Sequence, residues 1–562
     1  MEGIYIIDDG MNRISDLEFP RIDFAERKDA NDYHNFVVAL FENYEIGKLI
    51  IPIRLGKANL DHFSGLILGL HIRLTSEINN KRFIPLIFIG EEDLETVLLS
   101  TQNNPYNPGY LLTTKGCVYL TDISKANNYV LAESGVVNYE RDVLNHLKLN
   151  YLDIESGKHS LSNIWGALRL NDVLRLDAIP TNSDSYKKTR ELYFKYLRSY
   201  YTYDNKSYID LMPLNCNDKK ILLIDDESNK GWFEILRTIL KGSNLESINF
   251  QDRSFEDAYM ESQLKVKNND WDLILLDLRL NPETEDLPNQ IMKPEEYSGF
   301  KLLQIIKEYN EGIPVIVLTA SNKAWNMKKL LDAKADGYYI KESPEFNFSP
   351  KITKENYDNL KNEIIKCFKL SFLKNVFQVQ KKCFALIDAD MPTKALLYKQ
   401  FYERTKASLY ISFELLKKSD DDAKYMNLAF LTYYQILEDY VSQYENFRFV
   451  SNKECYVDNG IYRVINDSTG KLIWKLKYIK DTHGDYFEKL DEIKTQEISV
   501  QSLAKISFVL AFKFNKDNVY LKNWGNLNNI RNTKAGHGGA NNYISINEIM
   551  ELLEIIELFL TP

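Results

Sequence analysis

Four short runs of apolar residues between positions 219 and 343 alternate with amphipathic segments. Each run is continuous and ends in polar side chains; the four are KKILLIDDE, WDLILLDLRL, IPVIVLTA and ADGYYIKES. The segments between them, such as GFKLLQIIKEY, repeat apolar residues at the period of a helix. Continuous apolar strands that alternate with helices are typical of a parallel sheet covered on both faces. The pattern predicts a doubly wound α/β domain over residues 213–350.

The polar residues at the ends of these runs suggest a common chemistry. They are Asp225 and Asp226 after the first run, Asp277 in the second, Thr319 in the third and Lys341 in the fourth. Functional groups of such sheets gather at the carboxyl ends of the strands. Three carboxylates at one edge repel one another unless a hard cation neutralises them, and Mg²⁺ prefers oxygen ligands. A hydroxyl and an ammonium beside them can hold the oxygens of a phosphoryl group that one carboxylate carries.

On these residues, the segment 219–343 resembles the receiver domain of response regulators, which has a flavodoxin-like fold. The resemblance implies that Asp277 is the phosphoacceptor and that a histidine kinase or another signalling protein is the partner. It also implies Mg²⁺ binding by Asp225, Asp226, Asp277 and the backbone of Arg279, phosphoryl contacts by Thr319 and Lys341, and an aromatic switch at Tyr338. The alternative is a parallel-sheet domain that carries these acids incidentally.

The segment departs from the family pattern at two places. Between Arg279 and Gly299 the family usually has a few residues, whereas this chain has NPETEDLPNQIMKPEEYS at 281–298. This acidic, proline-containing insertion could cover the pocket or bind a partner. Glu342 follows Lys341 where the family usually has a proline. Both departures bear on how readily a kinase phosphorylates the domain.

The beginning of the chain repeats the same pattern without the same chemistry. IYIIDDG matches ILLIDDE, FSGLILGLHIR aligns without gaps to YSGFKLLQIIK, and IPLIFIG matches IPVIVLT. Asp8 and Asp9 are kept, but Pro52 stands in place of the phosphoacceptor. Gly90 replaces the threonine, and Thr113 replaces the lysine when PGYLLT is laid on DGYYIK.

Proline offers neither a nucleophile nor a metal ligand, so this copy cannot form an aspartyl phosphate. We therefore predict a degenerate pseudo-receiver over residues 1–125 that serves for docking or dimerisation. The alternative is a different α/β domain with coincidentally similar strands. Residues 126–212 predict a helical connector whose tyrosines pack against neighbouring elements.

Residues 351–562 predict a mostly helical domain. Long amphipathic helices are indicated by segments such as KYMNLAFLTYYQILEDYVSQY and SINEIMELLEIIELFL. Between them, KECYVDNGIYRVINDSTGKLIWKLKY predicts an inserted β-hairpin around Asn-Gly and Ser-Thr-Gly turns. Just before the last helix lies NNIRNTKAGHGG, in which Arg531 and Asn532 precede His537. Residues six apart on a helix lie roughly 120° apart around its axis, so Arg531 and His537 would diverge.

This motif in a helical domain resembles the HEPN superfamily, and its abortive-infection type most closely. The resemblance implies a dimeric, metal-independent endoribonuclease with Arg531, Asn532 and His537 as catalytic residues. The residue types suit that reaction, since histidine exchanges protons near neutral pH and a guanidinium holds phosphate oxygens bidentately. Because the two side chains diverge, we expect two chains to combine their motifs. The alternative is a plain helix end, where basic residues favour the dipole and glycine ends the helix.

Composition narrows the classes of function. The 562 residues carry a formal charge of -10, which argues against a protein that coats nucleic acid over its whole surface. Around the motif, however, the segment from Lys505 to Lys534 contains six basic residues and one acidic residue, Asp517, which gives it a local charge of +5. This cluster could follow a phosphate backbone or simply be solvated. Five cysteines without paired spacing indicate free thiols and no zinc site.

The leading interpretation is a signal-controlled endoribonuclease for phage defence, with an RNA substrate. The rival is a non-catalytic signalling adaptor, and a transcription factor is disfavoured by the negative charge and by the lack of a recognisable DNA-reading helix. The strand-like N-terminus is not a signal peptide, and no apolar run approaches the roughly 20 residues that cross a bilayer. We therefore expect a cytoplasmic protein without a membrane partner.

Overall fold

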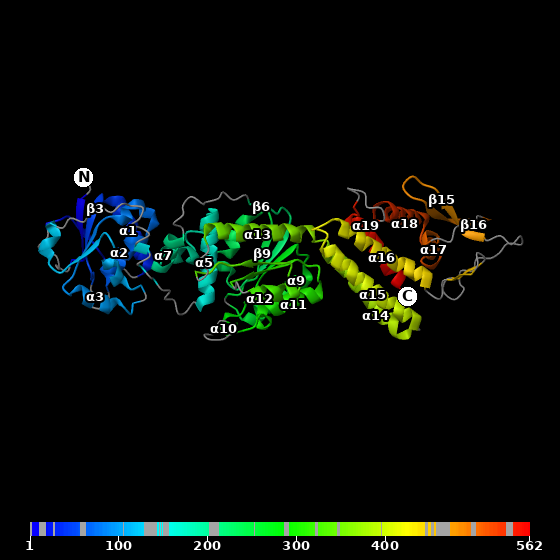
Figure 1. Ribbon diagram of the computed structural model, residues 1–562, viewed down its shortest axis with the longest axis horizontal. Helices are drawn as coiled ribbons and strands as arrows, with labels where there is room; N and C mark the ends of the chain where they lie inside the picture. The colour runs from blue at the N-terminus through cyan, green and yellow to red at the C-terminus, as the bar shows by residue number, and fades with distance from the viewer. Residues whose placement is uncertain are drawn as a thin grey trace.

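The structure of the chain is a computed structural model. Figure 1 shows two α/β units that follow one another along the long axis of the molecule, and then a helical unit. It describes residues 3–10, 18–25, 29–56, 63–104, 106–128, 143–144, 147, 149, 157–201, 213–251, 253–285, 292–320, 324–344, 349–394, 396–443, 448–450, 454–456, 473–495, 502–535 and 543–561. Among these residues, no helix is both long and apolar enough to span a membrane.

The first α/β unit is built on a five-stranded sheet in the order β2-β1-β3-β4-β5, with all strands parallel. Its strands are β1 (Gly3–Asp8), β2 (Arg21–Asp23), β3 (Ile46–Pro52), β4 (Leu86–Ile89) and β5 (Cys117–Leu120). The main helices are α1 (Ala30–Asn43), α2 (Ser64–Leu74) and α3 (Leu94–Thr101). Strand β3 is central and apolar on both faces, with Leu49, Ile50 and Ile51 fully buried.

The second α/β unit has the same topology in the order β12-β11-β10-β7-β9, again parallel throughout. Its strands are β7 (Lys220–Ile224), β9 (Asn244–Ser247), β10 (Leu273–Asp277), β11 (Val315–Thr319) and β12 (Gly337–Ile340). The helices are α8 (Trp232–Ile239), α9 (Phe255–Asn268), the short α10 (Pro282–Glu285), α11 (Ser298–Tyr309), α12 (Ala324–Asp332) and α13 (Pro350–Lys369). The prediction of parallel sheets with helices on both faces is confirmed.

Helix α13 belongs to the core of this second unit, although it lies beyond the predicted domain limit at residue 350. Its buried Tyr357, Leu360 and Ile364 pack in one cluster with strand residues such as Leu275 and Ile316. The apolar stripe of α13 therefore covers the sheet.

Strand register shows which residues of the two units correspond. In the first unit, Pro52 on β3 pairs with Ile89 on β4; in the second, Asp277 on β10 pairs with Leu318 on β11. Pro52 therefore lies at the same level of its sheet as Asp277, as predicted. The predicted match of Thr113 to Lys341 is wrong, because Pro108–Thr113 forms a 3-10 helix and the fifth strand is β5.

Counting along the fifth strand corrects that match. Leu120 pairs with Ile89 as Tyr339 pairs with Leu318. The residue two positions further on is Lys341 in the second unit and Asp122 in the first. The first unit therefore has an acid at the level where the second has its lysine.

A Ser-Gly pair after the third strand makes the same close contact in both units. The Gly65 amide donates to the Ile53 carbonyl and the Gly299 amide to the Leu278 carbonyl, each at 3.1 Å. A Cβ atom at Gly65 would lie 1.8 Å from the Pro52 oxygen, and one at Gly299 would lie 2.0 Å from the Asp277 oxygen. Only glycine lets the following helix approach the strand this closely.

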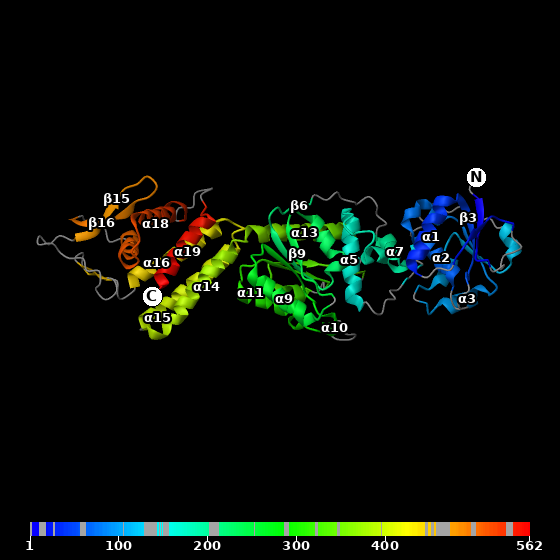
Figure 2. The same cartoon turned by 180° about the vertical axis from the view of Figure 1, so that it is seen from behind.

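The connector contains α5 (Gly157–Leu174), α6 (Asp184–Lys188) and α7 (Leu192–Tyr201), and α7 packs on both α/β units. Leu192 lies in the core of the first unit, whereas Phe194 lies in that of the second. Figures 1 and 2 both show α5 between α7 and the second sheet. The helical prediction for the described part of the connector is confirmed.

The C-terminal unit is mainly helical, as predicted, and it contains a β-hairpin. Its helices are α14 (Leu373–Asp390), α15 (Leu396–Lys417), α16 (Lys424–Gln443), α17 (Ser502–Phe508), α18 (Asn518–Ile530) and α19 (Ile546–Leu560). Strands β15 (Ile473–Ile479) and β16 (Tyr486–Thr495) pair antiparallel, as do the short β13 (Arg448–Val450) and β14 (Glu454–Tyr456). The chain turns between β15 and β16 at residues 480–485; the predicted Asn-Gly and Ser-Thr-Gly turns lie outside the described residues.

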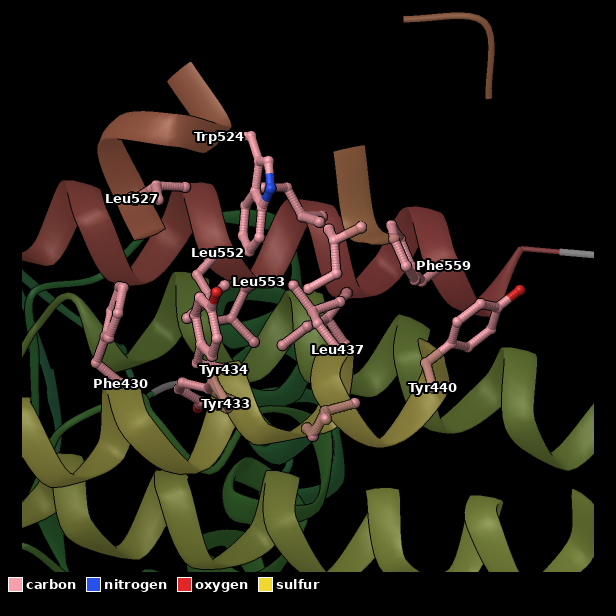
Figure 3. Packing of buried hydrophobic residues seen from close by; sticks show 14 of the residues in the cluster. Phe430, Tyr433, Tyr434, Leu437, Tyr440, Trp524, Leu527, Leu552, Leu553 and Phe559 are labelled. Carbon is pink, nitrogen blue, oxygen red and sulfur yellow. The ribbon is translucent and has the colours of Figure 1, made fainter. Parts of the chain in front are cut away.

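Figure 3 shows how α16, α18 and α19 bury their apolar faces against one another. The rings of Tyr434 and Trp524 stack with centroids 5.4 Å apart, and Leu553 packs in the same cluster. Burying each such side chain stabilises the fold by about 1.5–3 kcal/mol. Helix α19 begins where it does because Ser545 and Glu548 form a capping box.

We expect Gly65→Ala and Gly299→Ala each to lower the free energy of unfolding by about 1–3 kcal/mol, because the new methyl group collides with a backbone oxygen. Calorimetric unfolding of the full chain measures the loss. The control is Leu99→Ala at a surface position of α3, where Leu99 is 63% exposed. If either glycine variant unfolds like this control, the close contact is not required.

Candidate functional site

The carboxyl edge of the second sheet brings three aspartates together. Asp225 and Asp226 directly follow β7, and Asp277 is the last residue of the neighbouring β10. One carboxylate oxygen from each lies within 4.8 Å of the others. Asp225 and Asp277 are 0% and 1% exposed. The predicted cluster therefore exists, and its mutual repulsion is not relieved by solvent.

Lys341, which follows β12, places its ammonium group against this cluster. Its Nζ atom lies 2.8 Å from Asp225 Oδ2 and 3.0 Å from Asp277 Oδ1, and Lys341 is fully buried. Although burial by itself lowers the pKa of Lys341, the two carboxylates raise that pKa above its usual value. The lysine therefore stays charged and partly neutralises the aspartates.

The remaining negative charge fits a divalent cation. Asp226 Oδ1 is buried and has no hydrogen-bond partner among the described residues. Burial first, and then the neighbouring carboxylates, raise the pKa of Asp226 well above its usual value. A Mg²⁺ ion held by Asp225, Asp226 and Asp277 would supply the missing positive charge, and hard oxygen ligands suit that ion. The Arg279 amide lies 3.4 Å from Asp277 Oδ2, so the backbone of the predicted fourth ligand also borders the cluster.

Two further predicted residues lie on the neighbouring strands. Thr319 ends β11 and is 2% exposed, and its carbonyl accepts from the Lys341 amide at 2.7 Å. Tyr338 lies on β12 with 37% of its surface exposed, while the adjacent Tyr339 is buried. Thr319 therefore lies next to Lys341 at the same edge of the sheet, whereas Tyr338 is exposed at the surface.

The connector supplies a residue of this pocket that sequence patterns do not reveal. Asn163, on α5, accepts a hydrogen bond from Lys341 Nζ at its Oδ1 over 2.6 Å. Its Nδ2 donates to Glu227 Oε2 over 2.7 Å, and its backbone carbonyl accepts from Trp232 Nε1 over 3.1 Å. Asn163 lies more than 60 residues before the first aspartate in an ordinary helical pattern, so only the fold brings it to the site.

The residues just after Lys341 anchor the same helix. Glu342 Oε2 lies 3.8 Å from Arg169 Nε, and the Ser162 hydroxyl donates to the Ser343 hydroxyl over 3.2 Å. Burial raises the pKa of Glu342 to about 7, against the lowering by Thr353 and Arg169. The departure from the family pattern at Glu342 therefore coincides with a contact to the connector.

The insertion at 281–298 is held by Glu285 in its described part. The Glu285 carboxylate accepts from the backbone amides of Leu280, Asn281 and Ser298 at 2.6–3.3 Å. These bonds tie both ends of the insertion together beside β10. They place α10 next to the strand that carries Asp277, while residues 286–291 lie outside the described part.

The corresponding edge of the first unit is neutralised differently. Asp8 forms an ion pair with Arg21 at 2.8 Å, and the Asp9 carboxylate accepts from the Gly56 amide at 2.8 Å. The hydrogen bond from Arg21 lowers the pKa of Asp8. With Pro52 in the third strand and an arginine on Asp8, the described residues of this edge offer neither an acid at the level of Asp277 nor a matching trio of acids.

Comparison with known proteins agrees with this difference between the units. Residues 12–120 match the family model of the inactive receiver domain. The first part of the chain is thus similar to inactive receiver domains, and this match lies within the segment expected to be a degenerate pseudo-receiver. No curated protein is significantly similar to the chain.

Several solved receiver structures are similar to part of the chain. A two-component response regulator from Clostridium difficile is 23% identical, with 26% of this chain and 96% of that chain covered and a TM-score of 0.17. A CheY-like receiver domain protein from Methanospirillum hungatei is 21% identical, with 27% and 98% covered and a TM-score of 0.19. A Francisella receiver domain is 21% identical, with 26% and 98% covered and a TM-score of 0.17. Likenesses at these values identify neither a family nor a function for the whole chain.

The motif in the C-terminal unit is partly described. Arg531 continues α18 in a π-helical turn that runs from Arg531 to Ala535. Its guanidinium lies 5.1 Å from the centre of the Tyr434 ring and 3.3 Å from Glu438 Oε1, and Nη1 donates to Asn532 Oδ1 over 3.1 Å. The structure therefore brings Arg531 and Asn532 together, whereas His537 lies outside the described residues.

A polar surface cavity of about 410 Å³ is lined by residues of α15 and α16. It is lined by Arg404, Thr405, Ser408, Gln435, Ile436, Glu438 and Asp439. Arg531 is 37% exposed and contacts the lining residue Glu438. Two lysines of the basic cluster are paired, Lys522 with Asp481 at 3.0 Å and Lys534 with Glu548 at 2.8 Å, which reduces the local positive charge.

We expect Mn²⁺, a spectroscopic substitute for Mg²⁺, to bind the full chain at one site that Asp226→Asn weakens at least tenfold, because the cluster loses one anionic ligand. Electron paramagnetic resonance of free Mn²⁺ measures the affinity. The matched control is Asp9→Asn in the first unit, which should leave the affinity unchanged. Equal affinities of the two variants would place the ion elsewhere.

Proposed function

We propose that the chain is a signal-controlled effector whose second α/β unit accepts a phosphoryl group on Asp277. The observation that carries the proposal is the contact of one buried lysine with two of three clustered aspartates. In the transfer, an Asp277 carboxylate oxygen bonds to phosphorus while the bond from phosphorus to the donor breaks, and the donor leaves with its electron pair. Lys341 and a bound Mg²⁺ would stabilise the charge on the phosphoryl oxygens, and Thr319 would supply a hydroxyl.

In this proposal the first unit binds partners and carries no phosphoryl group. Its likeness to the inactive receiver family and its Asp8–Arg21 pair support that role. Helix α7 packs on both units, so a partner on the first unit has a physical route to the second. A histidine kinase or another phosphodonor protein is the proposed source of the phosphoryl group.

The proposed output is cleavage of RNA by a pair of C-terminal units in a homodimer. Support comes from the residue types Arg531, Asn532 and His537 and from the partly exposed Arg531 side chain, whose partner Glu438 lines a polar cavity. Histidine would exchange the proton of the ribose 2′-hydroxyl or of the leaving oxygen, and Arg531 would hold the phosphate. Phage defence is the proposed setting.

A non-catalytic adaptor is the second candidate. It is favoured by the pairing of Arg531 with Glu438 of the same chain, since a guanidinium engaged in this way must exchange partners before it holds a phosphate. In that case the helical unit would present a binding surface, and Arg531 would have a structural role.

We expect the full chain to incorporate one phosphoryl group on prolonged incubation with acetyl phosphate and Mg²⁺, and Asp277→Asn to abolish it, because an amide is not a nucleophile. Intact-mass spectrometry counts the group, and its loss in hydroxylamine identifies an acyl phosphate. The control Asp332→Asn, at an exposed position near the end of α12, should label normally. Equal labelling of Asp277→Asn would contradict the assignment.

We expect purified chain to cleave RNA without added metal, and His537→Ala or Arg531→Ala to slow cleavage by about 100-fold or more, as removal of a proton-transfer group or charge stabiliser does. Gel analysis of a labelled RNA in EDTA, before and after acetyl phosphate treatment, measures the rate. The control is Lys351→Ala, an exposed lysine on α13 that lies outside both the motif and the basic cluster. Absence of cleavage by every form, treated or not, would favour the adaptor.

A further inference from the structure

Helix α5 reaches the Asp277 site from outside the α/β unit, through the contact of Asn163 with Lys341. Residues from Ser160 to Leu174 are buried or nearly so, because one side of α5 packs on the second unit and the other on α7. The Arg198 guanidinium of α7 binds the Asp172 carboxylate of α5 at 2.7 and 3.1 Å. The two helices are therefore joined to each other as well as to the sheet.

The contact of α5 with the pocket is specific and polar. Asn163 is 0% exposed, and its amide bridges Lys341 and Glu227, which lie on opposite sides of it. A lysine ammonium has three hydrogens. In this structure they face Asn163, Asp225 and Asp277, so none is directed at an incoming phosphoryl oxygen.

We propose that α5 is a built-in lid of the phosphoacceptor pocket, and that Asn163 is its positioning residue. This inference rests on the proposed phosphoacceptor role of Asp277. A phosphoryl group on Asp277 would draw the Lys341 ammonium toward its oxygens, and this movement would lengthen the 2.6 Å hydrogen bond from Lys341 Nζ to Asn163 Oδ1. Phosphorylation and the closed position of α5 therefore oppose each other, and α7 carries the displacement of α5 toward the first α/β unit.

The lid also gives a role to Glu342, which follows Lys341 where receiver domains usually have a proline. Glu342 and Ser343 contact Arg169 and Ser162 of α5, so the segment that presents the lysine also holds the lid. Gly166 lies where α5 crosses this segment, and a Cβ atom there would lie 3.1 Å from the Glu342 oxygen and 3.1 Å from the Trp232 ring. A larger side chain at Gly166 would lift the helix.

The first test measures access to the pocket without any phosphoryl chemistry. In an Asp277→Cys chain, we expect iodoacetamide to alkylate the introduced thiol slowly, and Asn163→Ala to speed alkylation about tenfold, the effect of losing hydrogen bonds to charged groups. Peptide mass spectrometry distinguishes this thiol from the native cysteines. The matched control is Asn171→Ala, on the same helix, whose Oδ1 accepts from the Ala178 amide away from the pocket.

The second test measures the rate at which acetyl phosphate labels Asp277 in the otherwise unchanged chain, with the same two substitutions. Faster labelling and alkylation in Asn163→Ala but not in Asn171→Ala supports the lid. Equal rates in both, or an equal increase in Asn171→Ala, overturns it. If Asn163→Ala does not fold, Gly166→Leu replaces it with the same expectations. If Asn163→Ala speeds alkylation but acetyl phosphate labels no form of the chain, α5 covers Asp277 but Asp277 is not a phosphoacceptor. Failure of the lid and failure of the phosphoacceptor function are therefore distinguishable.

Discussion

Repulsion among three carboxylates at one sheet edge is the constraint on which the second α/β unit depends. Two neighbouring strand ends bring Asp225, Asp226 and Asp277 into a volume from which water is largely excluded, so their charges must be balanced locally. Lys341 supplies one positive charge, and a divalent cation fits the rest. In the proposed function the same charges would stabilise a phosphoryl group on Asp277, because they are in place before that group arrives.

The first α/β unit has the same strand order without a comparable cluster of three acids in its described part. Backbone packing is the same at the Ser-Gly pair, where Gly65 and Gly299 each approach a strand oxygen. The chemistry differs, since Pro52 stands at the level of Asp277 and Arg21 neutralises Asp8. Packing depends on many apolar contacts and tolerates such changes, whereas the chemistry of the sheet edge depends on single residues. The two units can therefore share a topology while their edges differ in chemistry.

The connector has a larger role than joining two domains. Its helix α5 brings Asn163 to Lys341, and its helix α7 packs on both units. The C-terminal unit, in contrast, is held by its own apolar cluster around Tyr434, Trp524 and Leu553. Tyr434 also lies beneath the Arg531 guanidinium, so the core that stabilises this unit also positions the arginine of its motif.

The sequence by itself determined the strands, most helices and the residues at the strand ends, because period and residue type are local properties of the chain. It identified the aspartates, Thr319 and Lys341 for the same reason: each follows its own apolar run. The placement of Asn163, the role of α13 in the second core and the level of Asp122 in the first sheet were decided only by tertiary structure. Each depends on which distant segments pack together and in which register, and no local pattern carries that information.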